Sequence, residues 1–397
     1  MTADLLTTSF RNYTWGSTTA LAELTGRRPT GEPEAELWMG AHPVAPARID
    51  RGQGSEALDT VIARDPQREL GDRVAGLFGA RLPFLMKLLA ADHALSVQVH
   101  PTTAQAAAGY EVEQAAGIPL DAPHRIYRDG HHKPELICAL GHFEALCGFR
   151  DPRATAALWQ RLALPVLDPW IQHLLTAPAE QALRTVLTAA LAEDRARGEQ
   201  AAAELPTALA HLASGDDADA ATWAAYRDAA HDYPGDPGIL AAMLLNHVRL
   251  NPGQVLYLDA GVPHAYLRGL GVEIMANSDN VLRCGLTPKH VDTAALAAVV
   301  DFRPTTPQHV AAVPVGPGEL EFRTPAAEFS LSQIELGAPL RIADDGPQIL
   351  LCVRGTALLE DGPALGPGQS AYLPAAGGPV RLDGDATLFR AKVPQPR

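Results

Sequence analysis

A short repeated frame constrains the fold of this chain more than any other feature. The residues Pro252-Gly253-Gln254, Tyr257-Leu258 and Ala260 recur 115 residues later as Pro367-Gly368-Gln369, Tyr372-Leu373 and Ala375. In both copies a Pro-Gly turn leads into a short apolar run, which is typical of a strand entered through a tight turn. One such turn is common, but six identities in a short window favour two related β units. The register places Pro379 where His264 stands, so the second unit lacks that histidine.

Short apolar runs separated by glycine and proline dominate both ends of the chain. They predict strands of antiparallel sandwiches or barrels, divided near the C-terminus by a linker over residues 304–317. The predicted strands cover residues 36–39, 82–89, 94–100, 136–140, 143–149, 255–258, 329–336, 348–353, 356–360, 370–373 and 386–393.

The pattern changes between residues 151 and 248, where alanine becomes abundant. Apolar residues recur at helical spacing around residues 183–191, and the same character continues over 201–212 and 220–230. Residues 291–300 predict one further helix. We therefore expect a mainly β protein with an α-helical insertion, in which residues 1–150 and 249–303 form one discontinuous jelly roll. Residues 151–248 form the helical domain, and residues 304–397 form a C-terminal jelly roll without a metal site.

The composition limits the class of protein. The chain has 397 residues, 47% of them hydrophobic, which is enough to bury several cores. Its net charge of −14 argues against nucleic acid and anionic membrane surfaces as partners, because both require basic patches. The N-terminus has no basic start followed by an apolar run, so we expect a cytoplasmic protein. The four cysteines show no CxxC spacing and are expected to be reduced and structural.

Lysine is rare, and its placement is informative. Only four of the 32 basic residues are lysines, namely Lys87, Lys133, Lys289 and Lys392, and the first three lie in motif-like segments. An ammonium group is a compact charge that suits a phosphate and whose pKa can be lowered for proton transfer. These three lysines are therefore candidate site residues. The alternative is a codon bias toward arginine in which three lysines remain by chance.

A candidate metal site is spread over three segments. The run Val97-Gln98-Val99-His100 alternates apolar and polar residues, so a strand there points Gln98 and His100 to one face. Glu135 begins the apolar run after Lys133-Pro134, and His264 follows a turn. One amide, two imidazoles and one carboxylate suit zinc or another divalent ion, and no thiolate closes the site. The alternative is that these are structural strand residues.

Several segments resemble the motifs of the type I mannose-6-phosphate isomerases, a family of the cupin superfamily. They occur in the family's order and span the chain from Tyr13 onward. The segments are YTWG (13–16), PEAELWMGAHP (33–43), SVQVHP (96–101), HKPE (132–135), PHAY (263–266) and MANSDNVLRCGLTPK (275–289).

The resemblance implies two cupin-like jelly rolls, the first of them catalytic, and one zinc ion held by Gln98, His100, Glu135 and His264. It further implies that Arg283 is the catalytic arginine. Other implied active-site neighbours are Trp15, Lys87, Lys133, Tyr266, Glu273, Asp279 and Lys289. His131 departs from the family, which commonly has asparagine there, and this leaves the role of the position open.

The implied reaction interconverts D-mannose 6-phosphate and D-fructose 6-phosphate through a cis-enediol. A metal ion and Arg283 would stabilise the developing enediolate oxygen. Lys133, Glu273 and Asp279 are the catalytic candidates for the base, among which the sequence does not choose. Lys87, Lys289 and Ser96 are assigned to the phosphate, and Trp15 and Tyr266 to the sugar pocket.

Two rival functions remain open at this stage. A cupin oxidoreductase would use iron or manganese with histidines and a carboxylate, but it has no need of three motif lysines. A sugar-binding jelly roll without activity is the other alternative. In each case we expect a small-molecule ligand, a sugar phosphate for the isomerase, and a monomer or weak homodimer.

Overall fold

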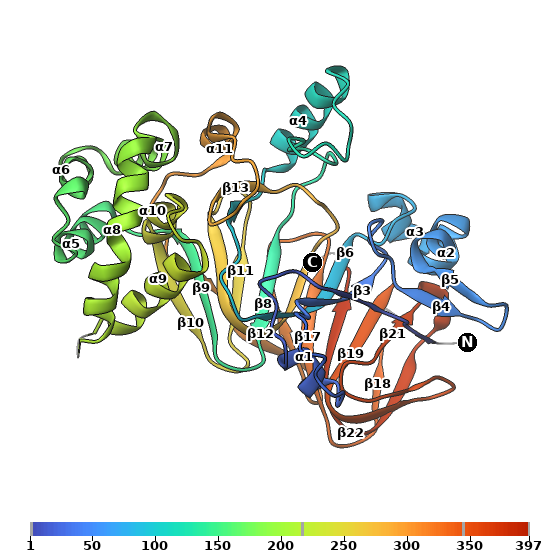
Figure 1. The fold of residues 1–397 in the computed structure, drawn as a ribbon. Helices are drawn as coiled ribbons and strands as arrows, with labels where there is room; N and C mark the ends of the chain where they lie inside the picture. Colours follow the sequence, from blue (N-terminus) through green and yellow to red (C-terminus); the bar gives the residue numbers. More distant parts are fainter. Residues whose placement is uncertain (1–2, 216–217, 344–345, 396–397) are drawn as a thin grey trace.

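Two large antiparallel sheets and one helical region make up the structure, a computed structural model that describes residues 3–215, 218–343 and 346–395. Figure 1 shows the helices of residues 152–232 at one end and the orange and red strands of the C-terminal sheet at the other. The sheet that carries the site lies between them. The protein is therefore mainly β with a helical insertion, as the sequence predicts.

The central sheet contains eleven strands, and its main path runs in the order β14-β11-β8-β12-β6-β3-β2. Its strands are β2 (Ser9–Arg11), β3 (Glu36–Gly40), β6 (Phe84–Ala91), β7 (Val97–Val99), β8 (Glu135–Ala139), β9 (Phe143–Phe149), β10 (Leu245–Leu250), β11 (Val255–Leu258), β12 (His264–Ala276), β13 (Leu282–Gly285) and β14 (Gln308–His309).

Alternation along the strands explains where the polar residues of this sheet lie. In β6, Met86 and Leu88 face the large core that also contains residues of the second sheet. Their neighbours Lys87 and Leu89 point to the opposite face, because successive side chains of a strand alternate. Glu135 in β8 and Glu273 in β12 share that second face by the same alternation, so the fold gathers charged groups on one side of a sheet whose other side is apolar.

The second sheet has nine strands, with the main order β1-β21-β19-β22-β17-β16-β15. Its strands are β1 (Asp4–Leu5), β15 (Ala312–Gly316), β16 (Glu319–Phe322), β17 (Ser330–Leu336), β18 (Leu340–Ile342), β19 (Gln348–Leu359), β20 (Ala364–Leu365), β21 (Ser370–Leu373) and β22 (Val380–Lys392). The N-terminal strand β1 pairs with β21, so the start of the chain belongs to the C-terminal sheet.

The repeated frame has the same structure in both sheets. Strand β8 pairs with both β11 and β12, and β19 pairs in the same way with both β21 and β22. The turns match atom for atom: the amide of Gly253 donates to Ala139 and that of Gly368 to Cys352, both over 2.8 Å. The side chains of Gln254 and Gln369 each accept a backbone N–H three residues earlier in the chain. The prediction of two related β units is confirmed.

Helices fill the region after β9. They are α5 (Pro152–Arg161), α6 (Asp168–Thr176), α7 (Ala179–Thr188), α8 (Arg195–Ala213), α9 (Ala220–Asp232) and α10 (Gly238–Met243). The carboxylate of Asp151 accepts two backbone N–H groups at the start of α5, which is the expected N-cap. The helices bury Trp159, Trp223 and Tyr226 in one core that continues onto β9 and β10. The later helix α11 (Thr293–Val299) falls where the sequence predicts it.

Two predictions of secondary structure are wrong. The first region contains four helices besides its strands: α1 (Ala20–Leu24), α2 (Leu58–Arg64), α3 (Pro66–Phe78) and α4 (Thr103–Ala115), together with the hairpin β4 (Arg48–Asp50) and β5 (Ser55–Ala57). The predicted linker 304–317 contributes β14 and β15, because backbone pairing with β11 and β16 satisfies its polar groups. Within the residues described, no helix is long and apolar enough to cross a bilayer.

Candidate active site

A cavity of about 460 Å³ opens on the polar face of the central sheet. Segments far apart in the chain line it, from the loop before β3 to the loop after β13. The predicted site residues in its wall are Trp15, Lys87, Ser96, Gln98, Lys133, Glu135, Tyr266, Glu273, Asp279, Arg283 and Lys289. The structure therefore brings together the residues proposed for catalysis and for substrate binding.

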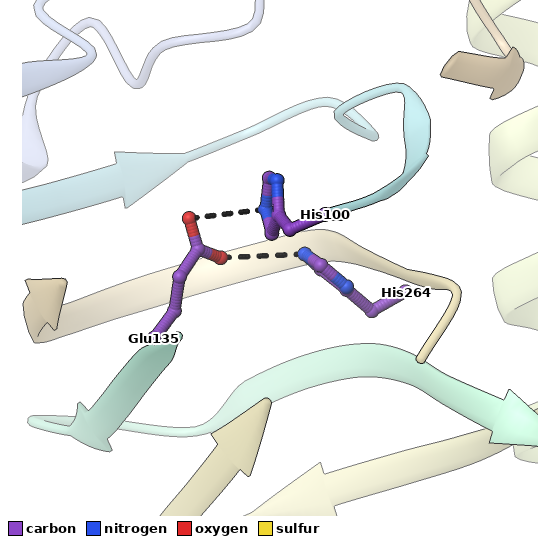
Figure 2. Close-up of side chains that lie close together, drawn as sticks. All are labelled: His100, Glu135 and His264. Atoms are coloured by element: carbon purple, nitrogen blue, oxygen red, sulfur yellow. Dashed lines mark ion pairs between the residues drawn. The ribbon is translucent and has the colours of Figure 1, made fainter. Parts of the chain in front are cut away.

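His100, Glu135 and His264 form a buried cluster beside the cavity. The Nε2 atoms of the two histidines lie 3.3 Å from the two oxygens of Glu135, one on each (Figure 2). One ligand atom of each residue lies within 4.8 Å of the others, close enough to share one ion. Glu135 begins β8, His264 begins β12 and His100 directly follows β7, so the ends of three strands set this geometry.

Hydrogen bonds on the far side of each imidazole fix its orientation. Nδ1 of His100 lies 2.8 Å from the carbonyl oxygen of Asn280, and Nδ1 of His264 lies 2.9 Å from that of Val262. A carbonyl only accepts, so Nδ1 carries the proton in both rings and Nε2 keeps its lone pair. Burial lowers the pKa of His100 to about 4, which keeps this ring neutral near pH 7.

The donor set fits a divalent metal ion. The Nε2 atom of His100 and Oε2 of Glu135 are buried, and neither has a hydrogen-bond partner among the described residues. Unpaired buried acceptors are costly, and a cation is the partner that lone pairs on two imidazoles and one carboxylate would share. Burial alone would raise the pKa of Glu135, but the charge of Lys133, 3.0 Å away, and its contacts with the two histidines hold it well below the usual value. The carboxylate is thus ionised and ready to bind a metal.

Gln98 lies in register between a metal-type histidine and the predicted catalytic arginine. In β7 it pairs with His264 on one side and with Arg283 on the other. Residues directly opposite in neighbouring strands share a face of the sheet. The amide of Gln98 reaches to 3.4 Å from Nε2 of His264, so a rotation of that amide presents its oxygen to the same cluster.

A second charged network lies on the same face of the central sheet as Glu135 of the metal-type cluster. The ammonium of Lys87 lies 2.8 Å from Glu36 and 2.6 Å from Glu273, and all three side chains are buried. The indole of Trp38 donates to Glu36 over 2.8 Å. The two carboxylates carry more negative charge than Lys87 carries positive charge, so this group of three residues has no net positive charge. Burial raises the pKa of Glu273 despite the nearby ammonium of Lys87.

The loop between β12 and β13 carries Asp279, and a carboxylate from another loop holds it in place. Asp129 accepts hydrogen bonds from the Ser278 hydroxyl at 2.9 Å and from the Asp279 amide at 3.0 Å. The side chain of Asp279 lies 3.4 Å from Nε2 of His42. Burial would raise the pKa of Asp279, but its contact with His42 brings it below the ordinary value.

Three cations lie close together at one side of the cavity: Arg283 and Lys289 line it, and Arg128 lies near both. Within the described part of the chain, Arg128, Arg283 and Lys289 form no ion pair. Burial first, and then the neighbouring charges of Arg283 and Arg128, lower the pKa of Lys289. Mutual repulsion of unpaired cations is tolerated where an anion binds, so this cluster is a candidate anion site.

The sequence analysis assigned no role to four residues that the structure places at the site. Glu36, Trp38 and His42 lie in or beside β3 and line the cavity, and Arg128 lies beside Arg283 and Lys289. The segment PEAELWMGAHP was singled out, and it contains the first three. Which of its side chains reach the cavity depends on strand pairing, because Trp38 becomes the partner of Lys87 only through the register of β3 and β6.

The fold and the site together define a cupin-type metalloenzyme with a polar cavity beside a histidine and carboxylate cluster. Residues 5–152 match the family model for the catalytic domain of phosphomannose isomerase type I. Mannose-6-phosphate isomerase of Escherichia coli (strain K12) is 41% identical over 392 residues, covering 97% of this chain and 98% of the relative. The Rattus norvegicus enzyme of that name is 32% identical, covering 90% of this chain and 84% of the relative.

Solved structures lead to the same family. A structure of mannose 6-phosphate isomerase from Salmonella typhimurium, bound to fructose 6-phosphate as substrate and to zinc, has a TM-score of 0.90 and 39% identity and covers 100% of both chains. A zinc-bound holo form of mannose 6-phosphate isomerase matches with the same TM-score of 0.90 and 39% identity, again over 100% of both chains. The chain belongs to the type I mannose-6-phosphate isomerase family.

Proposed function

We propose that the chain interconverts D-mannose 6-phosphate and D-fructose 6-phosphate with the help of one zinc ion. One observation carries the proposal: a single cavity joins a metal-type cluster, buried acid and base groups, and unpaired cations at one side. These are the parts that an aldose-ketose isomerase acting on a phosphorylated sugar requires. The match to a zinc-bound and fructose 6-phosphate-bound relative supports the choice of metal and substrate.

His100, Glu135 and His264 would hold the zinc ion, with Gln98 as the fourth protein ligand after its amide rotates. When bound, zinc acts as a Lewis acid that polarises a substrate oxygen and stabilises negative charge on it. Arg283 lies beside Gln98 in the sheet, so its guanidinium adds positive charge on the same side.

The isomerisation moves one proton between C2 and C1 of the sugar, and both transfers occur on one face of a cis-enediol. A general base works best when its pKa lies near the operating pH. Burial raises the pKa of Glu273, whereas that of Asp279 is lowered by its contact with His42. Among the predicted candidates we therefore favour Glu273 as base. Lys133, which contacts Glu135, would donate to substrate oxygens.

The phosphate group would bind at the cation cluster. Lys289 and Ser96 line the same cavity, and Arg128 and Arg283 add positive potential beside Lys289. Lys87 was also a candidate for the phosphate, but Glu36 and Glu273 would repel a dianion there. We therefore place Lys87 near the reacting carbons, where it holds Glu273, and we place Trp15 and Tyr266 against the sugar.

A coupled assay tests the function directly. Formation of fructose 6-phosphate from mannose 6-phosphate should stop when zinc is chelated and return when zinc is restored. A metal-dependent cupin oxidoreductase would instead contain iron and consume oxygen, and a sugar-binding jelly roll would show no turnover. Either result would reject the isomerase.

The same proposal bears on the compartment and the oligomeric state of the protein. The ligand is a small sugar phosphate of the cell interior, so we place the enzyme in the cytoplasm. We propose a monomer or weak homodimer, to be checked by light scattering over a range of protein concentrations.

A further inference from the structure

The connector between α9 and α10, residues 232–238, touches two separate walls of the cavity. It belongs to the helical region, whose core is shared with strands of the central sheet, β7 and β13 among them. Tyr233 in this connector lines the cavity itself. The contacts on either side of Tyr233 reach the segments that carry Ser96 and Lys289.

The first wall is the stretch before β7. The carboxylate of Asp232 accepts the backbone N–H of Ala94 over 2.9 Å and lies 2.7 Å from Nδ1 of His93. The hydroxyl of Tyr233 donates to the carbonyl of Ala94, also over 2.9 Å. Both polar groups of Ala94 are thus bound by the connector, and Ser96 stands two residues further on.

The second wall is the loop after β13. Asp236 accepts the N–H of Thr287 over 2.9 Å with one oxygen and that of Gly238 over 2.7 Å with the other. The hydroxyl of Thr287 in turn accepts the N–H of Lys289 over 3.1 Å. Two hydrogen bonds in series therefore connect the connector to the backbone of Lys289.

Backbone packing shows that this second contact is tight and specific. A Cβ on either Gly238 or Gly285 would overlap the backbone of the other, so both positions require glycine. Leu286 follows with a φ of +53°, a backbone conformation that residues other than glycine rarely adopt. Its side chain is fully buried in the helical core. A strained residue persists only where its surroundings hold it. The loop conformation that presents Lys289 thus depends on the helical region.

We infer that Asp236 is a positioning residue for the substrate's phosphate group, acting through Thr287 to hold Lys289 while Asp232 and Tyr233 hold the Ser96 wall. The inference rests on the proposed function, in which Ser96 and Lys289 face the phosphate. It assigns the helical insertion a role in binding: its connector sets the distance between the two walls that the phosphate must bridge.

Asp236→Ala tests the inference, with Asp151→Ala as the matched control. Asp151 also accepts two backbone N–H groups at a helix start in the same region, but it does not line the cavity. For Asp236→Ala we expect the Kd of inorganic phosphate, measured by calorimetry on the zinc-loaded protein, to rise by about fivefold to tenfold, the usual scale for one or two lost hydrogen bonds. KM for mannose 6-phosphate should rise by a similar factor while kcat changes by less than about threefold. Asp151→Ala should alter neither value.

A milder variant guards against loss of folding. In Asp236→Asn the amide can accept only one of the two N–H groups, since its NH₂ side is a donor, so a smaller rise in the same direction is expected. An unchanged phosphate Kd in both Asp236 variants, with zinc content retained, would overturn the inference. That outcome differs from failure of the proposed function, which would appear as absence of turnover in the parent protein. Phosphate binding is measured without turnover and decides the inference in either case.

Discussion

The ammonium of Lys87 lies 2.6 Å from Oε2 of Glu273, and the two residues face each other directly across β6 and β12. Both side chains are buried. A buried charge is tolerated when it is paired, so the lysine keeps the carboxylate in place within the cavity. Glu36 binds the same ammonium from the other side, which leaves the trio with a net negative charge.

Glu36→Gln should shift the acid limb of the pH profile of kcat/KM to lower pH. Burial is the main reason that the pKa of Glu273 is raised, and the negative charge of Glu36 adds to it. Removing that charge lowers the pKa of Glu273, so the deprotonated base persists to lower pH. Trp38→Phe, which removes the hydrogen bond to Glu36 but no charge, should leave the limb in place. If the acid limb is unchanged in Glu36→Gln, Glu273 is not the group whose titration sets this limb.

His100→Ala should remove both zinc and activity. The variant loses one imidazole from a cluster that offers few donors, and the remaining carboxylate and imidazole make a much weaker site. Metal content by atomic emission should fall from one zinc per chain to about zero, and turnover by at least about a thousandfold. His211→Ala alters an exposed histidine outside the cavity and should keep both. Stoichiometric zinc in His100→Ala would refute the ligand assignment.

Strands formed by short apolar runs were predictable to within a few residues, whereas several helices were not. The predicted strands at 143–149 and 255–258 have the bounds of β9 and β11, because apolar runs between turns leave little freedom. Helix α4 was missed because its alanine-rich sequence has no clear apolar face. Its start carries a recognisable signal, since Thr102 and Gln105 form a capping box.

The site could be predicted as a set of residues but not as a set of pairs. Motif positions identify Lys87 and Glu273 separately, yet their contact depends on the register of two strands distant in the chain. Register follows from how the two faces of the sheet are buried, which involves every strand at once. The same holds for the anchoring of Thr287 by Asp236, for which the sequence carries no local signal.

Lys289→Met should weaken substrate binding more than it slows the chemistry. Lys289 is exposed, lines the cavity and has no carboxylate partner among the described residues, so the loss of its ammonium costs little stability. KM for mannose 6-phosphate should rise by about tenfold or more, with kcat reduced by less than about fivefold. Lys392→Met removes a lysine outside the cavity and should leave KM unchanged. A fall in kcat with constant KM would place Lys289 at the reacting carbons instead.

Pro379→His should not create a second zinc site, although it restores the histidine missing from the repeated frame. Glu135 pairs with Leu258 in the first sheet, and Gln348 pairs with Leu373 at the matching place in the second. The side chain of Gln348 accepts a hydrogen bond from the guanidinium of Arg390 over 2.7 Å. The substitution would therefore meet an amide and a cation where a metal needs a carboxylate. Zinc content should stay at one per chain, and two per chain would contradict this reading of the second unit.

Glu328→Gln should destabilise the protein in a pH-dependent manner. Glu328 lies 2.7 Å from Nε2 of His132, a contact between the loop before β17 and the segment that leads to Lys133. The hydrogen bond that Nε2 of His132 donates to Glu328 raises the pKa of His132 above 6.5, and although burial raises the pKa of Glu328, His132 holds it below 4.5. Both groups are charged at pH values between the lowered pKa of Glu328 and the raised pKa of His132. The stabilisation is therefore full in that window and is lost as pH rises through the raised pKa of His132, or falls through the lowered pKa of Glu328.

The size of this effect is set by partial burial. The side chains of His132 and Glu328 are 26% and 12% exposed, so the pair is screened less than a surface pair. We expect Glu328→Gln to lower the free energy of unfolding by about 1 kcal/mol at about pH 6, and by clearly less at a pH above the raised pKa of His132, where its imidazole is neutral. Urea unfolding of the zinc-loaded proteins measures both values. Glu56→Gln breaks an exposed pair with Arg64 and should give the same small loss at both pH values, because arginine does not titrate in this range. A loss for Glu328→Gln that is equal at the two pH values would show that the charge of His132 does not contribute.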